Sequence, residues 1–594
     1  MLFWLGFVSI NIFCFLPYYL INIRQQANPF SFLTEKRVRH RKLHQLLFSK
    51  LEFSDPFRIN AEFSLILLIL LIFKTPLSVT VYISTGILLI SQIYIVYLSV
   101  MIFVFSRTPA FLSDLSLINT GIIIFKSRAV ALIIGLICFI GLLGYLAFHV
   151  NQWLIITYYN SAFLLQNTVT ILVLLTIVIF GLLDWKKRTT LALLDWRKYR
   201  YKDLHWRNVF STTHHLIRNI MFCKKYKTIL LQSKASFQQK NLFSKVKLKR
   251  QPNFVFICVE SYGARVYKDP KLAMHLESTI QNYREKFSHA GLHVASHFST
   301  SPIFSGGSWL SYTTFMYGTK VENIQLYDTL FESTNNFSEY ESIFHFMHRN
   351  GYHNLLCCPM GGVSDKDINW DPIKRCFQPD DIVDWKKLDF TGKKIPFFGL
   401  QKRFCAPDQY VINHGYERAK SQIEKPVCVF YCTMNSHIPW ISPTKVVEDW
   451  RSINTLDYMP ELSTDTMKSN HDKYLASINY QLSSVFDFAL NNQDDDMVLV
   501  VFGDHQPPLI AIPRMGLETP VHIISKNEPF IDTFKHYGFK KTMNLRGHKS
   551  HIKHEGFMSI FATACNQILG EDPSLDLPIL SNGVELNEVN DSTD

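Results

Sequence analysis

The sequence predicts a polytopic α-helical membrane domain followed by an α/β domain with helices on both faces of its central sheet. The first part of this prediction depends on apolar stretches of ~20 residues in the first third of the chain, a length that spans a bilayer as a helix. The second part depends on short β-rich runs that alternate with helical patterns from residue 251 onward.

Five apolar stretches are the candidate membrane spans. Helices of soluble proteins need a polar face, which these stretches lack. The first stretch has no basic start and no small-residue cleavage site, so we interpret it as an uncleaved anchor rather than a signal peptide. The second and third almost merge in the sequence. The spans are predicted at about 1–22, 60–83, 85–106, 129–149 and 160–183.

The chain is basic, with a net charge of +12 and a pI of about 9.0. Lys/Arg clusters at 36–42, 186–188 and 245–250 lie beside the apolar stretches. This position favours contact with anionic lipid over nucleic-acid binding. The eleven cysteines form no C-x-x-C pair that would indicate a zinc or redox motif.

Composition divides the chain into four parts. Residues 1–185 are the predicted membrane domain, 186–250 a basic juxtamembrane connector, 251–575 the α/β domain, and 576–594 an acidic, disordered tail. Ligands bind at strand ends in such α/β sheets. Within 251–575 the predicted strands are 253–259, 291–298, 353–358, 426–433 and 497–502, and the predicted helices are about 272–288, 309–317, 339–350, 408–423 and 469–492.

Metal-ligand types of residue end two of the predicted strands. Glu260 directly follows the apolar run Asn253–Val259, and Asp504-His505 follows the run Met497–Phe502 after a single glycine. Carboxylates and imidazoles suit a hard or borderline cation such as Mn²⁺, Mg²⁺ or Zn²⁺. Either patch alone is as typical of a polar turn after a core strand. The metal-site hypothesis therefore depends on the two strand ends meeting at one edge of the sheet.

A Gly-rich turn, Ser305-Gly306-Gly307-Ser308, precedes a helical stretch. Backbone N–H groups of such a turn can hold anionic oxygens, and a serine hydroxyl beside a metal can become a nucleophile. The alternative is that Ser308 is a simple helix N-cap. After another predicted strand comes His437, which could bind a phosphate oxygen or protonate a leaving group.

In this order and spacing the patches resemble the alkaline phosphatase/sulfatase superfamily and, within it, the lipoteichoic acid synthase and phosphoglycerol transferase group. The resemblance covers roughly residues 251–570 and implies an alkaline-phosphatase-like fold with a mixed central sheet. The matching pieces are Val259-Glu260-Ser261-Tyr262-Gly263, Gly306-Gly307-Ser308-Trp309-Leu310, Pro407-Asp408-Gln409-Tyr410, Asn435-Ser436-His437-Ile438-Pro439-Trp440 and, most specific, Gly503-Asp504-His505-Gln506-Pro507-Pro508.

The resemblance also implies roles for these residues. The expected ligands of one divalent ion, most favourably Mn²⁺, are Glu260, Asp504, His505 and the nucleophile. His437 and Asn435 are expected on the substrate side. The resemblance leaves the nucleophile open between Ser308, favoured because the helix opens there, and Ser305.

Two departures from the family pattern limit what the resemblance implies. Ser308 is followed by Trp309-Leu310 rather than by the Pro and Ser-Arg pattern of sulfatases proper, which argues against sulfate-ester hydrolysis. The segment 351–375 matches weakly, with Trp370 and Arg375 as possible stand-ins for the residues that grip the transferred group. The headgroup, phosphoglycerol or phosphoethanolamine, therefore stays open.

The function expected from this resemblance is transfer of a phosphoalcohol headgroup from a phospholipid donor to an envelope glycan or lipid acceptor through a covalent serine intermediate. The alternatives are a phosphodiesterase or sulfatase-type hydrolase of the same superfamily, and a non-catalytic membrane sensor or scaffold. The expected partners are the donor lipid, the acceptor and the membrane, with no nucleic acid.

The expected location is a multi-pass protein of the cytoplasmic membrane with its catalytic domain outside the cytoplasm. The basic loop 23–59 belongs in the cytoplasm by the positive-inside rule. Four further spans would then return the chain to the cytoplasm after residue 183. The charge pattern and the expected chemistry thus disagree, and we follow the chemistry.

Overall fold

The computed structural model divides the chain into two compact units, residues 1–226 and 227–594. Each unit is described by itself. The structure also describes short pieces and single positions between the main ranges. The main described ranges are 2–21, 59–73, 76–100, 168–179, 242–322, 341–362, 377–397, 400–422, 424–493, 495–511 and 516–584.

The first unit is helical. Helices α1 (Leu2–Ile21), α4 (Ala61–Phe73) and α5 (Leu77–Val100) pack around one apolar cluster, and a two-residue parallel pairing joins β1 (Ile59–Asn60) to β2 (Val209–Phe210). The predicted spans 60–83 and 85–106 have the wrong boundary, because α4 ends at Phe73 and α5 begins at Leu77. Proline disrupts a helix interior but is tolerated at a helix start, which accounts for a break at Pro76.

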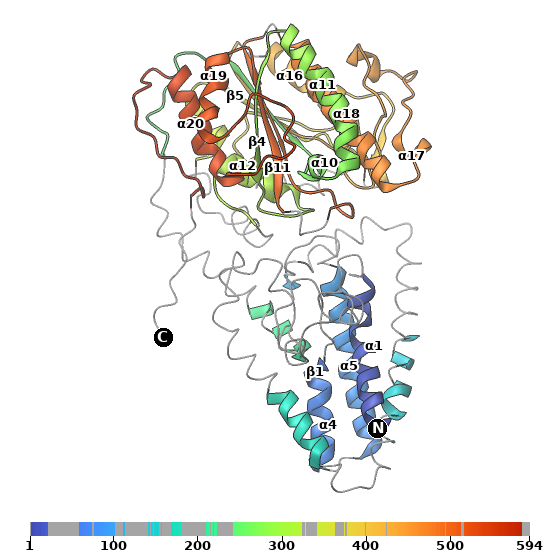
Figure 1. Ribbon diagram of the computed structural model, residues 1–594. Helices are drawn as coiled ribbons and strands as arrows, with labels where there is room; N and C mark the ends of the chain where they lie inside the picture. The colour runs from blue at the N-terminus through green and yellow to red at the C-terminus, as the bar shows by residue number, and fades with distance from the viewer. Residues whose placement is uncertain are drawn as a thin grey trace. The chain divides into compact units, whose positions relative to one another are not determined.

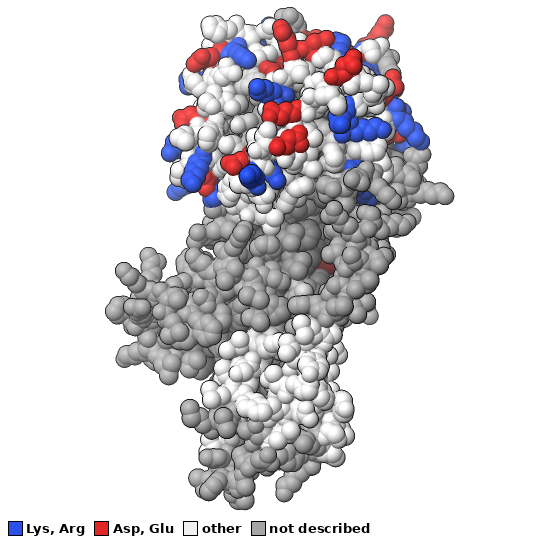
Figure 2. All heavy atoms as spheres, turned by 90° about the vertical axis from the view of Figure 1, so that its right-hand side faces the viewer, with Lys and Arg blue, Asp and Glu red and all other residues white. Residues whose placement is uncertain are grey.

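Within the described residues, one helix, Ser78–Leu98, is long and apolar enough to cross a membrane, and Phe3–Phe15 and Thr168–Ile179 are shorter apolar helices. The predicted spans at 129–149 and 160–183 lie largely outside the described residues. Large apolar side chains are exposed along this unit, including Phe73 (71%), Tyr82 (67%) and Ile90 (61%). Its described residues carry almost no charge on the face shown in Figure 2, whereas both signs are interspersed over the second unit.

The second unit is built on a mixed sheet in the order β12-β4-β11-β10-β3-β9-β5-β6, counted over the described residues. The strands β10, β3, β9, β5 and β6 are parallel, and β11 runs antiparallel to both of its neighbours. The strands are β3 (Asn253–Val259), β4 (His293–Thr300), β5 (His353–Cys357), β6 (Asp381–Val383), β9 (Val427–Cys432), β10 (Met497–Gly503), β11 (Glu518–Ser525) and β12 (Ile552–Lys553).

Helices cover both faces of the sheet (Figure 1), and alternating residues of the central strand β3 pack against different layers. Val255 and Ile257 belong to the core cluster shared with one layer, whereas Phe254 and Phe256 pack edge-on against Phe561 of the other, each with ring centroids 5.3 Å apart. This burial on both faces is typical of a central parallel strand. The first layer holds α11 (Pro270–His289), α16 (Asp408–Gln422) and α18 (Asn470–Asn491); the second holds α12 (Ser308–Tyr317), α14 (Ile343–Arg349), α19 (Glu528–Thr533) and α20 (His554–Leu569).

The α/β prediction is confirmed, and each of the ten predicted elements from 251 to 502 has its counterpart within a few residues. Sequence reasoning missed β11, α20 and the hairpin of β7 (Ile395–Phe397) with β8 (Leu400–Cys405). The antiparallel insertion of β11 depends on its neighbours in the sheet rather than on its own sequence.

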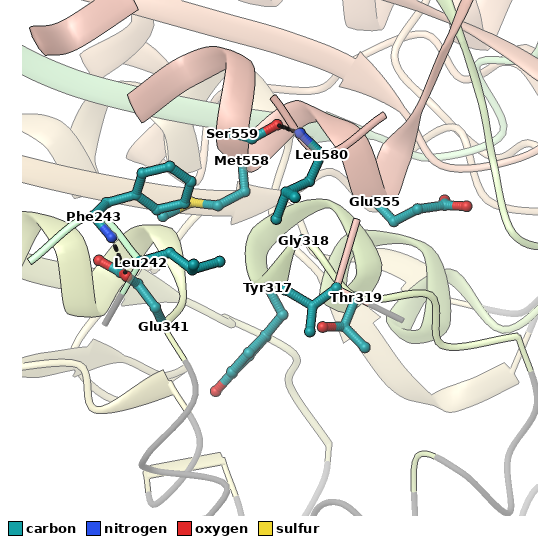
Figure 3. A pocket seen from close by; sticks show the side chains of 11 residues that line it. Leu242, Phe243, Tyr317, Gly318, Thr319, Glu341, Glu555, Met558, Ser559 and Leu580 are labelled. Carbon is teal, nitrogen blue, oxygen red and sulfur yellow. Dashed lines mark hydrogen bonds between the residues drawn. The ribbon is translucent and has the colours of Figure 1, made fainter. Parts of the chain in front are cut away.

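Both ends of the α/β domain extend further than predicted. Leu248, expected in the juxtamembrane connector, bridges to Gly570 and is buried. Residues 576–584, expected in a disordered tail, are instead placed against α12 and α20: the Val584 N–H donates to Gly318 (2.7 Å) and the Leu580 N–H to Ser559 (3.0 Å). Figure 3 shows the two ends lining one pocket at the C-terminal end of α12. The rest of the predicted tail lies outside the described residues.

Candidate metal and phosphotransfer site

Three ligand-type side chains meet where β3 and β10 end. The strands are parallel neighbours in register, with Val259 opposite Gly503, so the residues that follow them emerge side by side. Glu260, Asp504 and His505 are all buried, and each offers a ligand atom within 4.8 Å of the others. The His505 Nε2 lies 3.3 Å from Asp504 Oδ2 and 3.5 Å from Glu260 Oε1.

Close contact between the strand ends requires a glycine at position 503. A Cβ atom added there would lie 1.9 Å from the Tyr262 carbonyl oxygen. Between these chain segments Ser261, in the left-handed region with φ 60°, bonds to both carboxylates. Its N–H donates to Asp504 Oδ1 (2.8 Å) and its hydroxyl donates to Glu260 Oε1 (2.9 Å).

Ser308 completes the group from a third element. It is the first residue of α12, preceded by Gly306 and Gly307, both in the left-handed region with φ 65° and 81°. The Ser308 hydroxyl donates to Glu260 Oε2 (2.6 Å) and lies 3.3 Å from His505 Nε2. The helix start provides unpaired backbone N–H groups and a positive dipole end beside this hydroxyl, which favour an anionic group there.

The donor set fits a divalent cation. His505 Nδ1 donates to the Gln506 carbonyl (3.0 Å), so the neutral ring presents the lone pair of Nε2 toward the two carboxylates. Asp504 Oδ2 is buried, and no hydrogen-bond donor among the described residues reaches it. Two carboxylates, an imidazole and a hydroxyl around one point suit Mn²⁺, Mg²⁺ or Zn²⁺.

The protonation preferences of the group agree with this fit. Burial and the charge of Glu260 hold the pKa of Asp504 well above its usual range. Burial also acts to raise the pKa of Glu260, but the charges of His505 and His437 and the bond from Ser308 outweigh it, so that this pKa is lowered. Burial lowers the pKa of His505, against the opposing charge of Glu260. A cation would favour the fully ionised pair of carboxylates.

The turn after β9 contacts the same strand end. The Glu260 N–H donates to Thr433 Oγ1 (3.0 Å), and the Ser436 hydroxyl donates to the Glu260 carbonyl (2.7 Å). His437 follows in this turn, and its Nδ1 donates to the Ile438 carbonyl (2.6 Å) while its ring packs against Phe397, 5.0 Å away between centroids. In the neutral tautomer this leaves Nε2 as the basic nitrogen of His437.

The other predicted residues differ in their placement. Ser305 is 2% exposed, whereas Ser308 is partly exposed. The substrate contact expected of Asn435 stays a prediction; in this structure the side chain is buried and its amide is hydrogen-bonded inside the fold. Its oxygen accepts from the Asp408 N–H (2.8 Å), and its nitrogen donates to Cys405 Sγ (3.2 Å). Trp370 and Arg375 lie outside the described residues.

Sequence reasoning gave no role to Ser261, Thr433, Ser436 or Asp408, although all four stand in or beside the matching pieces. These residues act through hydrogen bonds to the backbone or to carboxylates. Thr433 and Ser436 bond to the Glu260 backbone, which lies 173 or more positions away in the chain. Small polar residues next to a predicted ligand were the only available signal.

Comparison with known proteins identifies the family of the catalytic part of the chain. The family model for sulfatases matches residues 252–560, just over half of the chain. The chain therefore belongs to the sulfatase family. It is an enzyme of the alkaline phosphatase superfamily, as the sequence resemblance implied.

Solved structures with some similarity include the lipoteichoic acid synthase LtaP from Listeria monocytogenes, 12% identical over 58% of this chain and 80% of that one, with a TM-score of 0.37. The C-terminal periplasmic domain of EptC from Escherichia coli is 11% identical over 58% of this chain and 90% of that one, with a TM-score of 0.35. The phosphoglycerol transferase GacH from Streptococcus pyogenes is 12% identical over 57% of this chain and 85% of that one, with a TM-score of 0.31. Similarities this low assign no function. Among curated proteins, none matches this chain.

Proposed function

We propose that this chain is a membrane-bound, metal-dependent phosphotransferase that moves a phosphoalcohol headgroup, phosphoglycerol or phosphoethanolamine, from a phospholipid to an envelope glycan or lipid through a covalent Ser308 intermediate. The observation that carries the proposal is the Ser308 hydroxyl, which stands at a helix start 2.6 Å from Glu260 and 3.3 Å from His505.

Glu260, Asp504, His505 and Ser308 would hold one divalent ion, most favourably Mn²⁺. When bound, such an ion supplies positive charge that polarises the phosphoryl oxygens and favours the ionised serine hydroxyl. The start of α12 adds N–H groups that would hold the non-bridging oxygens of the phosphodiester.

Two displacements at phosphorus account for transfer. In the first, a bond forms from Ser308 Oγ to phosphorus as the bond to the diacylglycerol oxygen breaks, and that oxygen takes a proton. In the second, the acceptor alcohol loses its proton, attacks the same phosphorus and releases Ser308 Oγ, which regains its proton. His437 is the candidate acid and base, since it follows directly in the turn whose Thr433 and Ser436 bond to Glu260.

A lipid donor is supported by the first unit, where apolar side chains are exposed along α4 and α5. We propose that this unit anchors the protein by several spans in the cytoplasmic membrane, with the catalytic unit outside the cytoplasm. Basic clusters near the apolar stretches would contact anionic headgroups.

The direct test uses the full-length protein in lipid nanodiscs with Mn²⁺ and a phospholipid labelled in its headgroup. The proposal predicts diacylglycerol release and label transfer to an added glycolipid acceptor, both lost in Ser308→Ala and retained in Ser305→Ala. Free labelled headgroup at the same rate with and without acceptor would instead identify a hydrolase. Full turnover in Ser308→Ala would exclude the proposed nucleophile.

A further inference from the structure

We propose that Asp408, which touches none of the candidate ligands, is a positioning residue that fixes Glu260 and His437 through the turn at residues 433–437. This inference rests on the proposed function, because it assigns Asp408 an effect on the same metal site. Asp408 is the first residue of α16 and is fully buried.

The carboxylate of Asp408 is an acceptor for the turn. Its Oδ2 accepts from the backbone N–H groups of Asn435 (2.7 Å) and Met434 (3.1 Å). The side chains of Gln481 (2.6 Å to Oδ2) and Tyr431 complete its shell, the Tyr431 hydroxyl donating to Oδ1. All four groups are donors, which requires an ionised acid that accepts on both oxygens.

Burial raises the pKa of Asp408 to about 6. The carboxyl is therefore ionised at pH 7, in the state that the four donors require.

The turn at residues 433–437 also accepts a hydrogen bond from the Asp408 backbone. Asn435 Oδ1 accepts from the Asp408 N–H (2.8 Å), so that the helix start and the turn are joined in both directions. The His437 N–H donates to the Met434 carbonyl (3.1 Å), which ties the position of the histidine to the residue that Asp408 holds.

The same turn is also hydrogen-bonded to the backbone of Glu260, a candidate metal ligand. Thr433 accepts from the Glu260 N–H, and Ser436 donates to the Glu260 carbonyl. The Thr433 N–H donates to the Cys258 carbonyl (2.9 Å), two residues earlier on β3. Both polar groups of the Glu260 peptide are thus bonded to a turn whose next residues are bonded to Asp408. A change at Asp408 should reach the Glu260 carboxylate through these bonds.

The test is Asp408→Asn in the full-length protein, with Mn²⁺ affinity and headgroup transfer measured at pH 7. The amide keeps the shape but places an N–H₂ group against N–H donors of the turn. We expect the Mn²⁺ dissociation constant to rise about 10–100-fold, the usual effect of losing a group that supports a metal ligand. The loss of transfer at saturating Mn²⁺ should appear mainly in kcat, because Glu260 and His437 are displaced rather than removed.

A matched control separates positioning from general stability. Asp487 on α18 is partly buried, whereas Asp408 is fully buried; like Asp408 it accepts from a tyrosine, Tyr283 (2.9 Å), but it has no bond to the turn. Asp487→Asn should change Mn²⁺ affinity by less than about twofold even if it lowers Tm. Tyr431→Phe removes a single donor to Asp408 and serves if Asp408→Asn does not fold, with an expected three- to tenfold loss of Mn²⁺ affinity, about the value of one hydrogen bond.

A double-mutant cycle tests whether Asp408 acts on Glu260 through the turn at residues 433–437. Thr433→Val removes the acceptor of the Glu260 N–H. If Asp408 acts through the turn, Asp408→Asn and Thr433→Val together should weaken Mn²⁺ binding by less than the product of their separate effects. Mn²⁺ affinity unchanged in Asp408→Asn, or effects that multiply fully, would overturn the inference while leaving the proposed function in place. A wild-type protein that binds no Mn²⁺ would overturn both.

Discussion

Gly503→Ala is expected to open the junction between β3 and β10 and to weaken the metal site without changing any ligand. The new Cβ would lie 1.9 Å from the Tyr262 carbonyl oxygen, whereas ordinary contact begins at 3.4 Å, so the two segments must separate by about 1.5 Å. The atom that blocks it belongs to the backbone of the turn that directly follows β3, so it cannot rotate away as a side chain could.

The expected cost is about 2–4 kcal/mol, at or above the upper range for overpacking. For a unit of this size that corresponds to a fall in Tm of roughly 3–6 °C. Separation also lengthens the bond from the Ser261 N–H to Asp504 Oδ1, now 2.8 Å, so Mn²⁺ affinity should fall at least about tenfold.

The measurements are thermal unfolding and Mn²⁺ titration of the full-length protein. Gly291→Ala is the control, because its Cβ would meet nothing within 4 Å and only its φ of 67° is unfavourable, costing about 1 kcal/mol. Gly503→Ala with wild-type Tm and Mn²⁺ affinity would refute the close approach of the two strand ends.

Three further outcomes are expected. Glu260→Gln and His505→Gln should each abolish high-affinity Mn²⁺ binding. EDTA should abolish transfer in the wild type until Mn²⁺ is restored. Transfer that persists in excess EDTA would contradict the metal site. Burial lowers the pKa values of His522 and His554 to about 3, so these two groups bind fewer protons in the folded state than in the unfolded state below the ordinary value of 6.5. Their contribution to stability should fall with decreasing pH between roughly pH 6 and 4, while Asp408, whose pKa is raised to about 6, contributes with the opposite sign. The pH dependence of denaturant unfolding should therefore change in His522→Gln, and an unchanged dependence would contradict the shift. A reporter fused after residue 594 should be active only outside the cytoplasm, and cytoplasmic activity would exclude the proposed orientation.

The sequence was sufficient for the α/β class and for the meeting of Glu260 with Asp504 and His505, because both leave local signals. The runs before Glu260 and Asp504 are strongly strand-like, and a ligand type follows each at once. Parallel pairing of β3 with β10 then brings the two together. The split of α4 from α5 was misplaced, although Lys74-Thr75-Pro76 interrupts the apolar run between Phe73 and Leu77.

Other features depend on distant partners and have no local signal. The role of Asp408 arises from bonds to residues 23 to 73 positions away. Asn435 has the composition of a substrate contact, but the fold uses its amide to join a turn to a helix start. Residues 576–584 have the composition of a tail, yet their backbone bonds to α12 and α20 place them on the domain.

The central claim is that Ser308 carries the phosphoryl group during transfer. Its most direct test is mass spectrometry of the full-length protein incubated with donor lipid and Mn²⁺ but no acceptor. We predict a phosphoalcohol adduct on the peptide that contains Ser308, assigned to that residue by fragmentation and discharged when acceptor is added. An adduct on Ser305, or transfer to acceptor with no enzyme adduct at any time, would contradict the account.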